Sequence, residues 1–599
     1  MTDAPVDDPT DFDDADRGWI ASLDPAIVTS DDGRVVWDND AYAFLGGPCP
    51  PTAHPGLWRQ GQLVARQGLY RVTEGIYQVR GLDLSNMTLV EGRSGVIVID
   101  PLISTETAAA ALALYRSHRG HRPVTAVVYT HAHVDHFGGV HGVVTGEVPI
   151  LAPEGFMESA VSENIYAGVA MSRRALYMYG SALDKGPTGQ IGCGLGMTTS
   201  TGSIGLIPPT VSIVRTGQEE TVDGVRIEFQ LTPGTECPAE MNFLFPDLRA
   251  LCLAENATHN LHNLVTLRGA VVRDARVWAS YLDEAITRFA GRCDVAFASH
   301  HWPTWDPPRI VDYLSLQRDL YAYLHDQTLR LINQGHTGIE AAELLEMPPA
   351  LDAAWHTHGY YGSVSHNVKA VYQRYLGWFD GNPANLWQHP PVERALRYVE
   401  CMGGADEVMG KAEDYQRRGD LRFAADLLDR VVFADPGNGR AKEQLAGVYD
   451  QLAHGSENGT WRNFYLMGSH ELRHGIVTSP PATVSPQMLR ALSVGQLFDA
   501  IAIRVNGPRA WDEELTIDWE FTDLGQVHRT TLRNGVLTHR ADVAAGGAEL
   551  ELTLTTAQMI DLVTGRGFEG IGHRGDLGVV GRLLAVLDAP DHNFAIVTP

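Results

Sequence analysis

The chain has little cysteine, few basic residues and no long apolar run. Its six cysteines among 599 residues are scattered, without a Cys-x-x-Cys pair, which argues against a disulfide framework or a cysteine-rich zinc knot. Because 46 Lys and Arg face 73 Asp and Glu, the net charge is −27, so nucleic acid and anionic membranes are poor partners. No window approaches the roughly 18 to 20 apolar residues of a transmembrane helix, and the sequence predicts no membrane span.

The N-terminus lacks the basic stretch and apolar core of a secretory signal, and together with the scattered cysteines this predicts a cytoplasmic protein. The first forty residues contain twelve Asp and two basic residues, and we interpret residues 1–55 as an acidic arm in solvent. Hydrophobic residues make up 44% of the chain and charged residues 20%. These values are typical of a globular enzyme, and the length predicts three or four domains.

Residues 56–390 begin with alternating strand-like and helical segments. Gly95–Asp100 and Val124–Thr130 are β-branched runs typical of buried strands, and Thr105–His118 between them is rich in Ala and Leu, as in a helix. This order predicts a layered α/β domain with functional loops at its strand ends.

Residues 153–210 have a different composition, rich in Gly, Ser and Thr, with Tyr177 and Tyr179 expected at the surface. Long insertions of this kind are uncommon in a compact domain and often form part of an active site. We therefore predict a loop insertion that forms one wall of the site.

Two further units follow. Residues 391–475 predict a helical domain in which one stretch is similar to a single tetratricopeptide unit, through Tyr415, Gly419, Ala424, Leu428 and Pro436. One such unit leaves an apolar face uncovered, so docking or dimerisation is expected. Residues 480–599 predict a small α+β domain, because Leu515–Phe521 alternates strictly and Asn534-Gly535 is typical of a hairpin turn.

The strongest chemical signal is a cluster of four possible metal ligands directly after the strand that ends at Thr130. His131 and His133 can converge on one ion, and Asp135 and His136 can turn toward a second. Imidazole and carboxylate ligands suit Zn²⁺. Solvent-exposed loop histidines are the plainer interpretation, but a strand-end loop is where metal ligands are expected.

A mononuclear iron site would use only His133 and Asp135, as the His-x-Asp of a facial triad. A dinuclear site needs more ligands, and three polar residues follow apolar strand-like runs downstream: Glu236, Glu255 and His300. Each alone would more often be an ordinary loop residue. Together with the 131–136 cluster, they favour a dinuclear centre.

These motifs, with the Thr232–Gly234 turn, resemble the metallo-β-lactamase superfamily. Generic members have a histidine just after that turn and an aspartate as the bridging ligand, whereas this chain has Glu236 and Glu255. Both departures are similar to the zinc-dependent alkylsulfatases. Four further stretches resemble that branch: Ser85–Thr88, Leu261–Gly269, Gly359–Asn367 and Tyr372–Pro383. The resemblance covers nearly the whole chain apart from the acidic arm.

The resemblance implies an α/β fold of the metallo-β-lactamase αββα type over residues 56–390, a helical dimerisation domain over 391–475, and a C-terminal domain over 480–599 similar to sterol carrier protein 2. It implies two Zn²⁺ per chain and a homodimer. One zinc would take His131, His133 and Glu236. The other would take Asp135, His136 and His300, and Glu255 and a hydroxide would bridge the two ions. The implied reaction is hydrolysis of an alkyl sulfate ester to an alcohol and sulfate.

Substrate recognition must be local, because the net charge repels a sulfate ester and salt screens that field within about 8 Å. Arg268 is the best candidate for the head group, since guanidinium pairs with two oxyanion oxygens. The resemblance adds Asn263 and His366 to the sulfate contacts. His262 is a candidate general acid, needed if water attacks sulfur and of little use if it attacks carbon. The sequence leaves both routes open.

Other functions are weighed against these residues. A formylglycine sulfatase needs Cys-x-Pro-x-Arg, and the stretch from Cys49 has Ala53 where the arginine belongs. A lactam, thioester or phosphodiester hydrolase of the same fold is disfavoured by Glu236 and Glu255. A non-catalytic lipid-binding scaffold would have lost ligands, and here every expected ligand is present.

Overall fold

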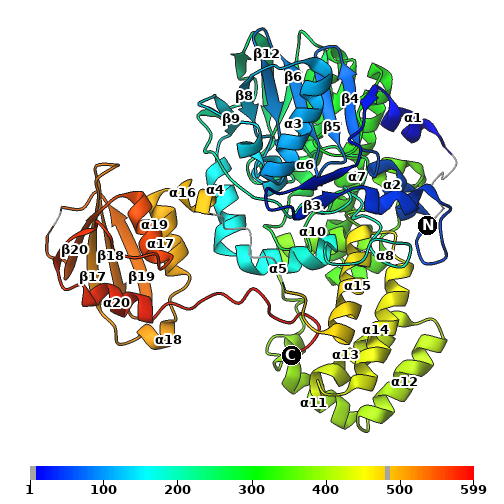
Figure 1. The fold of residues 1–599 in the computed structure, drawn as a ribbon. Helices are drawn as coiled ribbons and strands as arrows, with labels where there is room; N and C mark the ends of the chain where they lie inside the picture. The colour runs from blue at the N-terminus through cyan, green and yellow to red at the C-terminus, as the bar shows by residue number, and fades with distance from the viewer. Residues whose placement is uncertain (1–7, 479–485, 545) are drawn as a thin grey trace.

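The computed structural model describes residues 8–478, 486–544 and 546–599. In the first half of the chain, two β-sheets stack face to face (Figure 1). The first sheet has the order β1-β4-β5-β6-β7-β8-β9-β10 and the second runs from β11 to β16 in sequence order. The strands of the first sheet are β1 (Trp19–Ala21), β4 (Gly68–Thr73), β5 (Ile76–Arg80), β6 (Met87–Glu91), β7 (Val96–Ile99), β8 (Val124–Val128), β9 (Ile150–Pro153) and β10 (Val211–Ile213). Those of the second are β11 (Glu219–Val222), β12 (Val225–Leu231), β13 (Met241–Phe245), β14 (Ala250–Cys252), β15 (Val295–Phe297) and β16 (Thr304–Trp305).

Helices cover the outer faces of this sandwich, which confirms the predicted αββα arrangement. α3 (Thr105–Arg119) lies on the first sheet, and α6 (Ala275–Phe289) and α7 (Pro307–Ile332) lie on the second (Figure 1). The inner faces meet in an apolar core in which Ile97 and Val128 of one sheet pack with Phe243 of the other. Burial of these side chains against one another stabilises the sandwich.

The local sequence explains why β7 is followed by a helix. The Val96–Ile99 run is fully buried and pairs in parallel with β8, so the chain must cross over between them. Ser104 caps the crossover helix α3 by accepting a hydrogen bond from the Thr107 backbone N–H at 3.4 Å. Gly120, with a φ of 84°, ends it.

Residues 153–210 are only partly a loop, which corrects the prediction of a loop insertion. α4 (Phe156–Val161), the π-helical turn η4 (Ser162–Tyr166) and α5 (Gly168–Tyr179) occupy the first half. Tyr177 and Tyr179 are buried rather than exposed. The apolar spacing of α5 was obscured by the Gly-, Ser- and Thr-rich stretch that follows it.

The acidic N-terminal stretch does not extend into solvent, which corrects the interpretation of residues 1–55 as a solvated arm. α1 (Thr10–Asp16) is held by arginines of the main body, with Arg59 3.1 Å from Asp11 and Arg309 2.6 Å from Asp14. β1 then pairs with β4. Composition alone misjudged the stretch because its counter-charges lie far along the chain. Residues 1–7 lie outside the described residues.

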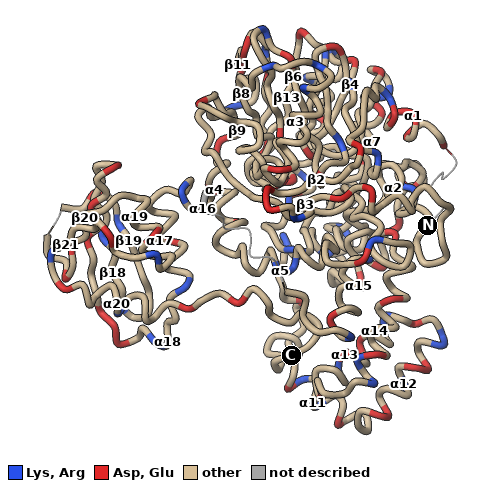
Figure 2. The backbone as a smooth tube through the Cα atoms, in the orientation of Figure 1, with Lys and Arg blue, Asp and Glu red and all other residues tan. Residues whose placement is uncertain are grey.

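Short elements complete this part of the chain. They are β2 (Ile27–Thr29), β3 (Val35–Asp38), α2 (Pro55–Val64), α8 (Gly338–Leu344), α9 (Pro349–Ala353) and α10 (Val364–Leu376). Asp and Glu residues are spread over all parts of the chain in Figure 2. Among the described residues, no helix combines the length and the hydropathy that a membrane span requires.

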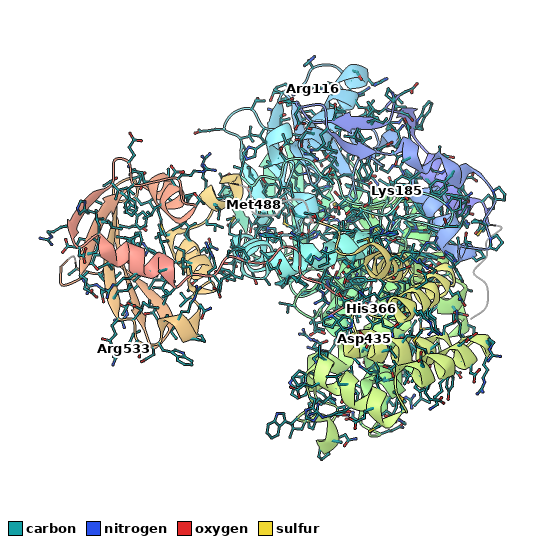
Figure 3. All side chains as sticks on the ribbon, turned by 60° about the horizontal axis from the view of Figure 1, so that its bottom comes forward. Arg116, Lys185, His366, Asp435, Met488 and Arg533 are labelled. Atoms are coloured by element: carbon teal, nitrogen blue, oxygen red, sulfur yellow. The ribbon has the colours of Figure 1, made fainter. Side chains whose placement is uncertain are left out.

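The helical unit consists of α11 (Pro391–Cys401), α12 (Ala405–Arg417), α13 (Leu421–Ala434), α14 (Gly439–His454) and α15 (Gly459–His474). The predicted Ala424 and Leu428 are fully buried in its core. His366 of α10 lies where the first domain meets these helices (Figure 3), and its Nδ1 is 3.4 Å from Trp461 Nε1 of α15. The helical unit thus packs directly against the first domain.

The C-terminal unit has a five-stranded sheet of order β19-β18-β17-β20-β21. The predicted alternation is confirmed, since Leu515, Ile517, Trp519 and Phe521 are all buried. Asn534 and Gly535 join two strands with φ values of 54° and 73°, as a type I′ turn requires. The elements are α16 (Pro486–Arg490), α17 (Val494–Ala502), α18 (Gly507–Ala510), β17 (Leu515–Phe521), β18 (Gln526–Arg533), β19 (Val536–Ala541), β20 (Leu550–Leu554), α19 (Thr556–Val563), β21 (Gly572–Gly575) and α20 (Gly578–Ala585). Residues 480–485, at the predicted start of this domain, lie outside the described residues.

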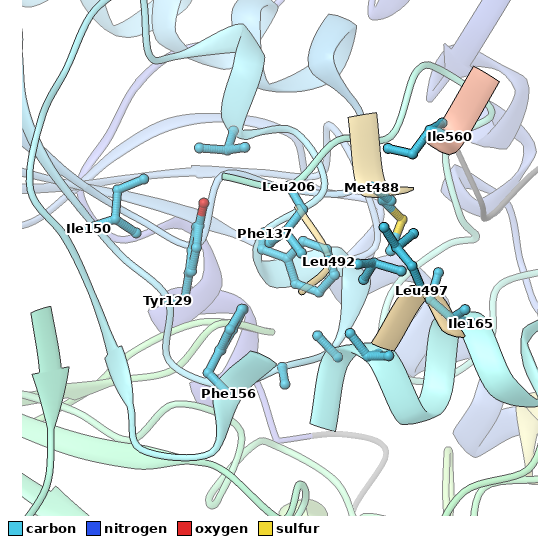
Figure 4. Packing of buried hydrophobic residues seen from close by; sticks show 14 of the residues in the cluster. Tyr129, Phe137, Ile150, Phe156, Ile165, Leu206, Met488, Leu492, Leu497 and Ile560 are labelled. Atoms are coloured by element: carbon cyan, nitrogen blue, oxygen red, sulfur yellow. The ribbon is translucent and has the colours of Figure 1, made fainter. Parts of the chain in front are cut away.

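The C-terminal unit docks on η4. Ile165 packs in one apolar cluster with Met488, Leu492 and Leu497 (Figure 4), and the Tyr166 hydroxyl donates to Asp499 Oδ2 at 3.0 Å. After α20, the chain runs back to the helical unit (Figure 1), where Glu471 of α15 accepts from the Ile596 backbone N–H at 3.0 Å.

The docking of α1 gives a stability prediction. Arg59→Gln removes the ion pair with Asp11 and the stacking on Trp355, whose ring centre is 4.1 Å from the guanidinium carbon. Because Arg59 is almost fully buried, we expect the free energy of unfolding to fall by about 2 to 3 kcal/mol in denaturant titrations. Arg71→Gln, which breaks an exposed pair with Glu74, is the control and should cost less than about 1 kcal/mol. Equal effects of the two substitutions would contradict the docking.

Candidate metal centre

The strand ends converge at one edge of the sandwich, as the sequence predicts. His131 to His136 follow β8, Glu236 follows β12, Glu255 follows β14 and His300 follows β15. All seven predicted ligands are buried. The structure therefore brings together side chains that are up to 169 positions apart in the sequence, since His131 and His300 share one centre.

The seven side chains form two groups, in each of which the candidate ligand atoms lie within 4.8 Å of one another. The first contains His131, His133, Glu236 and Glu255, and the second contains Asp135, His136, Glu255 and His300. Glu255 belongs to both groups. This is the arrangement expected of two ions that share one carboxylate.

Glu255 Oε2 is central to the cluster. It lies 3.4 Å from His131 Nε2, 3.3 Å from His136 Nε2 and 3.2 Å from His300 Nε2. In the first group, Glu236 Oε2 lies 2.6 Å from His133 Nδ1 and 3.2 Å from His131 Nε2.

Asp100, at the end of β7, fixes histidines of both groups. Its Oδ2 accepts from His136 Nδ1 at 2.9 Å and from the Thr130 hydroxyl at 2.8 Å, and the same hydroxyl lies 3.0 Å from His131 Nδ1. His300 Nδ1 is likewise 3.1 Å from the carbonyl oxygen of Leu84. These bonds place the Nδ1 protons away from the cluster and leave each Nε2 free to bind a metal.

Several polar atoms of the cluster are buried without a hydrogen-bond partner among the described residues. They include Nε2 of His136 and His300, and Oε2 of Glu236. Buried polar atoms are nearly always satisfied, and these face one another across distances that a cation would fill. The donor set of imidazoles and carboxylates therefore fits divalent metal ions, zinc foremost.

The charges of the cluster are strongly coupled. Burial alone would lower the pKa of His133, but the carboxylates of Glu236 and Glu163 raise it to about 10. Burial would likewise raise the pKa of Asp135, but His136 and His300 hold that pKa well below its ordinary value. Metal ions would replace the protons on these histidines, so metal affinity should fall as the pH falls.

A cavity of about 220 Å³ opens onto the cluster. Its polar floor includes His133, Asp135, Glu236 and Glu255. Its apolar wall comes largely from α5 and from residues near 195–204, with Met171, Ala175, Leu176, Leu195 and Ile204. The cavity can therefore hold a ligand with a charged end at the cluster and an apolar remainder along α5.

Two guanidinium groups reach the cavity. Arg268, predicted from the sequence, lines it and lies 3.0 Å from Glu163 Oε2. Arg273, which the sequence did not reveal, also lines it, donates to the Glu236 carbonyl at 2.6 Å and pairs with the Glu236 carboxylate.

The other three predicted residues do not line the cavity. His262 Nε2 lies 2.7 Å from Glu255 Oε1, and this contact favours orienting Glu255 over acting as a general acid. Asn263 accepts from Arg273, and His366 donates to the Val265 carbonyl. Burial lowers the pKa of His366 to about 4, so it is neutral at pH 7.

Four residues that contact the ligands or their loops were not predicted from the sequence: Asp100, Glu163, Glu240 and Arg273. Asp100 carried a usable signal, because it directly follows a buried strand. Glu240 accepts from the backbone N–H groups of Glu236 and Glu255, at 3.1 and 3.2 Å, and so positions both loops. Glu163 and Arg273 lie in segments without periodicity, and only the fold brings them to the site.

Family models match three parts of the chain. They are the metallo-beta-lactamase superfamily over residues 80–300, alkyl sulfatase dimerisation over 337–475 and alkyl sulfatase C-terminal over 482–599. The dimerisation match begins before the predicted boundary at 391 and takes in α8 to α10.

Known proteins are similar over the full length. A linear primary-alkylsulfatase from Pseudomonas sp is 47% identical over 100% of this chain and 91% of its own. An (R)-specific secondary-alkylsulfatase from Pseudomonas sp is 44% identical over 100% and 92%. The structure of the stereoselective inverting sec-alkylsulfatase Pisa1 from Pseudomonas sp. matches with a TM-score of 0.97 at 42% identity, covering 100% of this chain and 96% of that one.

Asp100 offers a direct test of the centre. Asp100→Asn removes the acceptor that orients one histidine of each group, so both metal ions should be held about 10 to 100 times more weakly in chelator competition. Asp247→Asn, an exposed aspartate paired with Arg226, is the control. A loss confined to one ion would show that Asp100 does not serve both groups.

Proposed function

This chain belongs to the alkylsulfatase family of the metallo-β-lactamase superfamily, and from that membership we propose that it hydrolyses alkyl sulfate esters to an alcohol and inorganic sulfate. The observation that carries the proposal is the pair of metal-ligand groups joined by Glu255 at the floor of a half-apolar cavity. An enzyme of this class, a sulfuric ester hydrolase, needs both features at one place.

We propose two zinc ions per chain. His131, His133 and Glu236 would hold one ion, Asp135, His136 and His300 the other, and Glu255 both. Such ions supply an activated water and neutralise negative charge that develops in the reaction. The chain's own contribution is to hold seven ligand side chains in a buried site from which the apolar wall excludes bulk water.

The head group would bind at the guanidinium groups of Arg268 and Arg273. Both line the cavity, and guanidinium matches the paired oxygens of a sulfate. Asn263 and His366 would position these arginines. Asn263 accepts a hydrogen bond from Arg273, and His366 donates to the backbone carbonyl of Val265, three residues before Arg268. His262 would keep Glu255 between the two groups.

The alkyl chain would lie along α5 and the residues near 195–204, where the cavity wall is apolar. Burial of each methylene contributes about 0.8 kcal/mol. Longer chains should therefore bind more tightly until the cavity is filled.

We also propose that the chain forms a homodimer through the face between α10 and α11, over residues 375–398. Large apolar side chains there are exposed, with Trp387 96% and Trp378 76% accessible, beside Leu386 and Leu396. Several large apolar side chains exposed on one short segment are typical of an interaction site. In this proposal, residues 391–475 form the dimerisation domain and 480–599 the domain similar to sterol carrier protein 2.

The reaction is tested by incubating zinc-loaded protein with octyl sulfate and with chiral 2-octyl sulfate in ¹⁸O water. We expect sulfate release, and the position of the label reports whether the C–O or the S–O bond breaks. Absence of sulfate release from both esters by protein that holds two zinc ions would contradict the proposed function.

Arg268→Ala tests the head-group site. It removes a charge-assisted hydrogen bond to sulfate and should weaken the binding of octyl sulfate by about 1.5 to 3 kcal/mol, seen as a higher KM, while zinc content stays at the wild-type value. Unchanged KM and kcat would exclude Arg268 from the head-group site.

Trp387→Asp tests the dimer face. Loss of a central tryptophan and gain of a charge should weaken association by at least about 2 kcal/mol, measured by analytical ultracentrifugation. Trp511→Asp, at an exposed tryptophan of the C-terminal unit, is the matched control and should leave the dimer intact.

A further inference from the structure

We propose that Glu163 is a positioning residue that holds both the first metal-ligand group and the head-group arginine. The claim about Arg268 and the substrate rests on the proposed function. The claim about the metal-ligand group rests on the metal centre alone. It assigns to η4 a role in the site that the sequence did not predict.

One carboxylate oxygen of Glu163 contacts both a metal-ligand histidine and the head-group arginine. Oε2 lies 3.2 Å from His133 Nε2 and 3.0 Å from Arg268 Nη2. The other nitrogen of His133, Nδ1, faces Glu236 in the first group. Glu163 thus stands to His133 as Asp100 stands to His136, as the acid that orients a ligand imidazole from outside.

Glu163 is buried and lines the cavity beside the arginine that it binds. An unrestrained arginine side chain loses rotamer entropy when it is fixed on a ligand, and a fixed partner removes part of that cost beforehand. With Glu163 in place, Arg268 already lies in the cavity wall when the ester arrives.

The segment that carries Glu163 is held from its other side by the C-terminal unit. η4 is a π-helical turn between two α-helices, a feature frequent at functional sites. Its Ile165 packs on α16 and α17, as Figure 4 shows, and its Tyr166 bonds to Asp499. This docking fixes the turn from which the Glu163 side chain reaches the site.

The test compares Glu163→Gln with Glu158→Gln in the full-length protein. Glu158 is exposed on the adjacent helix α4, so it is a matched control. In chelator competition without substrate, we expect Glu163→Gln to hold one of its two zinc ions about 10 to 100 times more weakly and the other as in the wild type. At saturating zinc, the KM for octyl sulfate should rise severalfold, and Glu158→Gln should match the wild type in both assays.

Two outcomes would overturn the proposal: wild-type zinc affinity in Glu163→Gln, or an unchanged KM at saturating zinc. Arg268→Ala separates the two halves, because it should raise KM without changing zinc affinity. If Glu163→Gln fails to fold, Glu163→Asp keeps the charge but shortens the reach, and the same losses are expected. If no variant, nor the wild type, hydrolyses the ester, the proposed function fails, and the zinc measurement still tests the metal half.

Discussion

The structure depends on one electrostatic constraint, the burial of three carboxylates and four imidazoles in a single cluster. Buried charges are costly unless they are paired or bind metal ions. Here Glu255 Oε2 lies within 3.4 Å of three imidazole nitrogens, and other ligand atoms have no hydrogen-bond partner among the described residues. Two divalent cations would satisfy all of these atoms together.

Around the cluster, the fold holds the ligand side chains in place through several sets of contacts. Strand ends of both sheets fix the backbone of the ligands. Asp100 orients His136 directly and His131 through the Thr130 hydroxyl, and Glu240 holds the loops of Glu236 and Glu255. α5 adds the apolar wall. The membership in the alkylsulfatase family accords with this order, since an ester with one charged and one apolar end needs both surfaces at once.

Much of this could be predicted from the sequence, because strand ends are local patterns. A polar residue after a buried apolar run indicated His131 to His136, Glu255 and His300, and the structure brings all of them together. The strand and hairpin of the C-terminal unit were predictable for the same reason. Arg273 and Glu163 were not, because their positions depend on how distant segments pack. The general-acid role of His262 stays a prediction, because the structure shows only its contact with Glu255. The acidic N-terminus was misjudged because Arg59 and Arg309, which neutralise it, lie far along the chain.

The central claim is that one carboxylate joins two metal groups. Crystals of the zinc-loaded protein, measured at the zinc absorption edge, test it most directly through the anomalous scattering. The account predicts two peaks per chain, one beside His131, His133 and Glu236 and one beside Asp135, His136 and His300, with Glu255 between them. A single peak, or two peaks that Glu255 does not bridge, would contradict it.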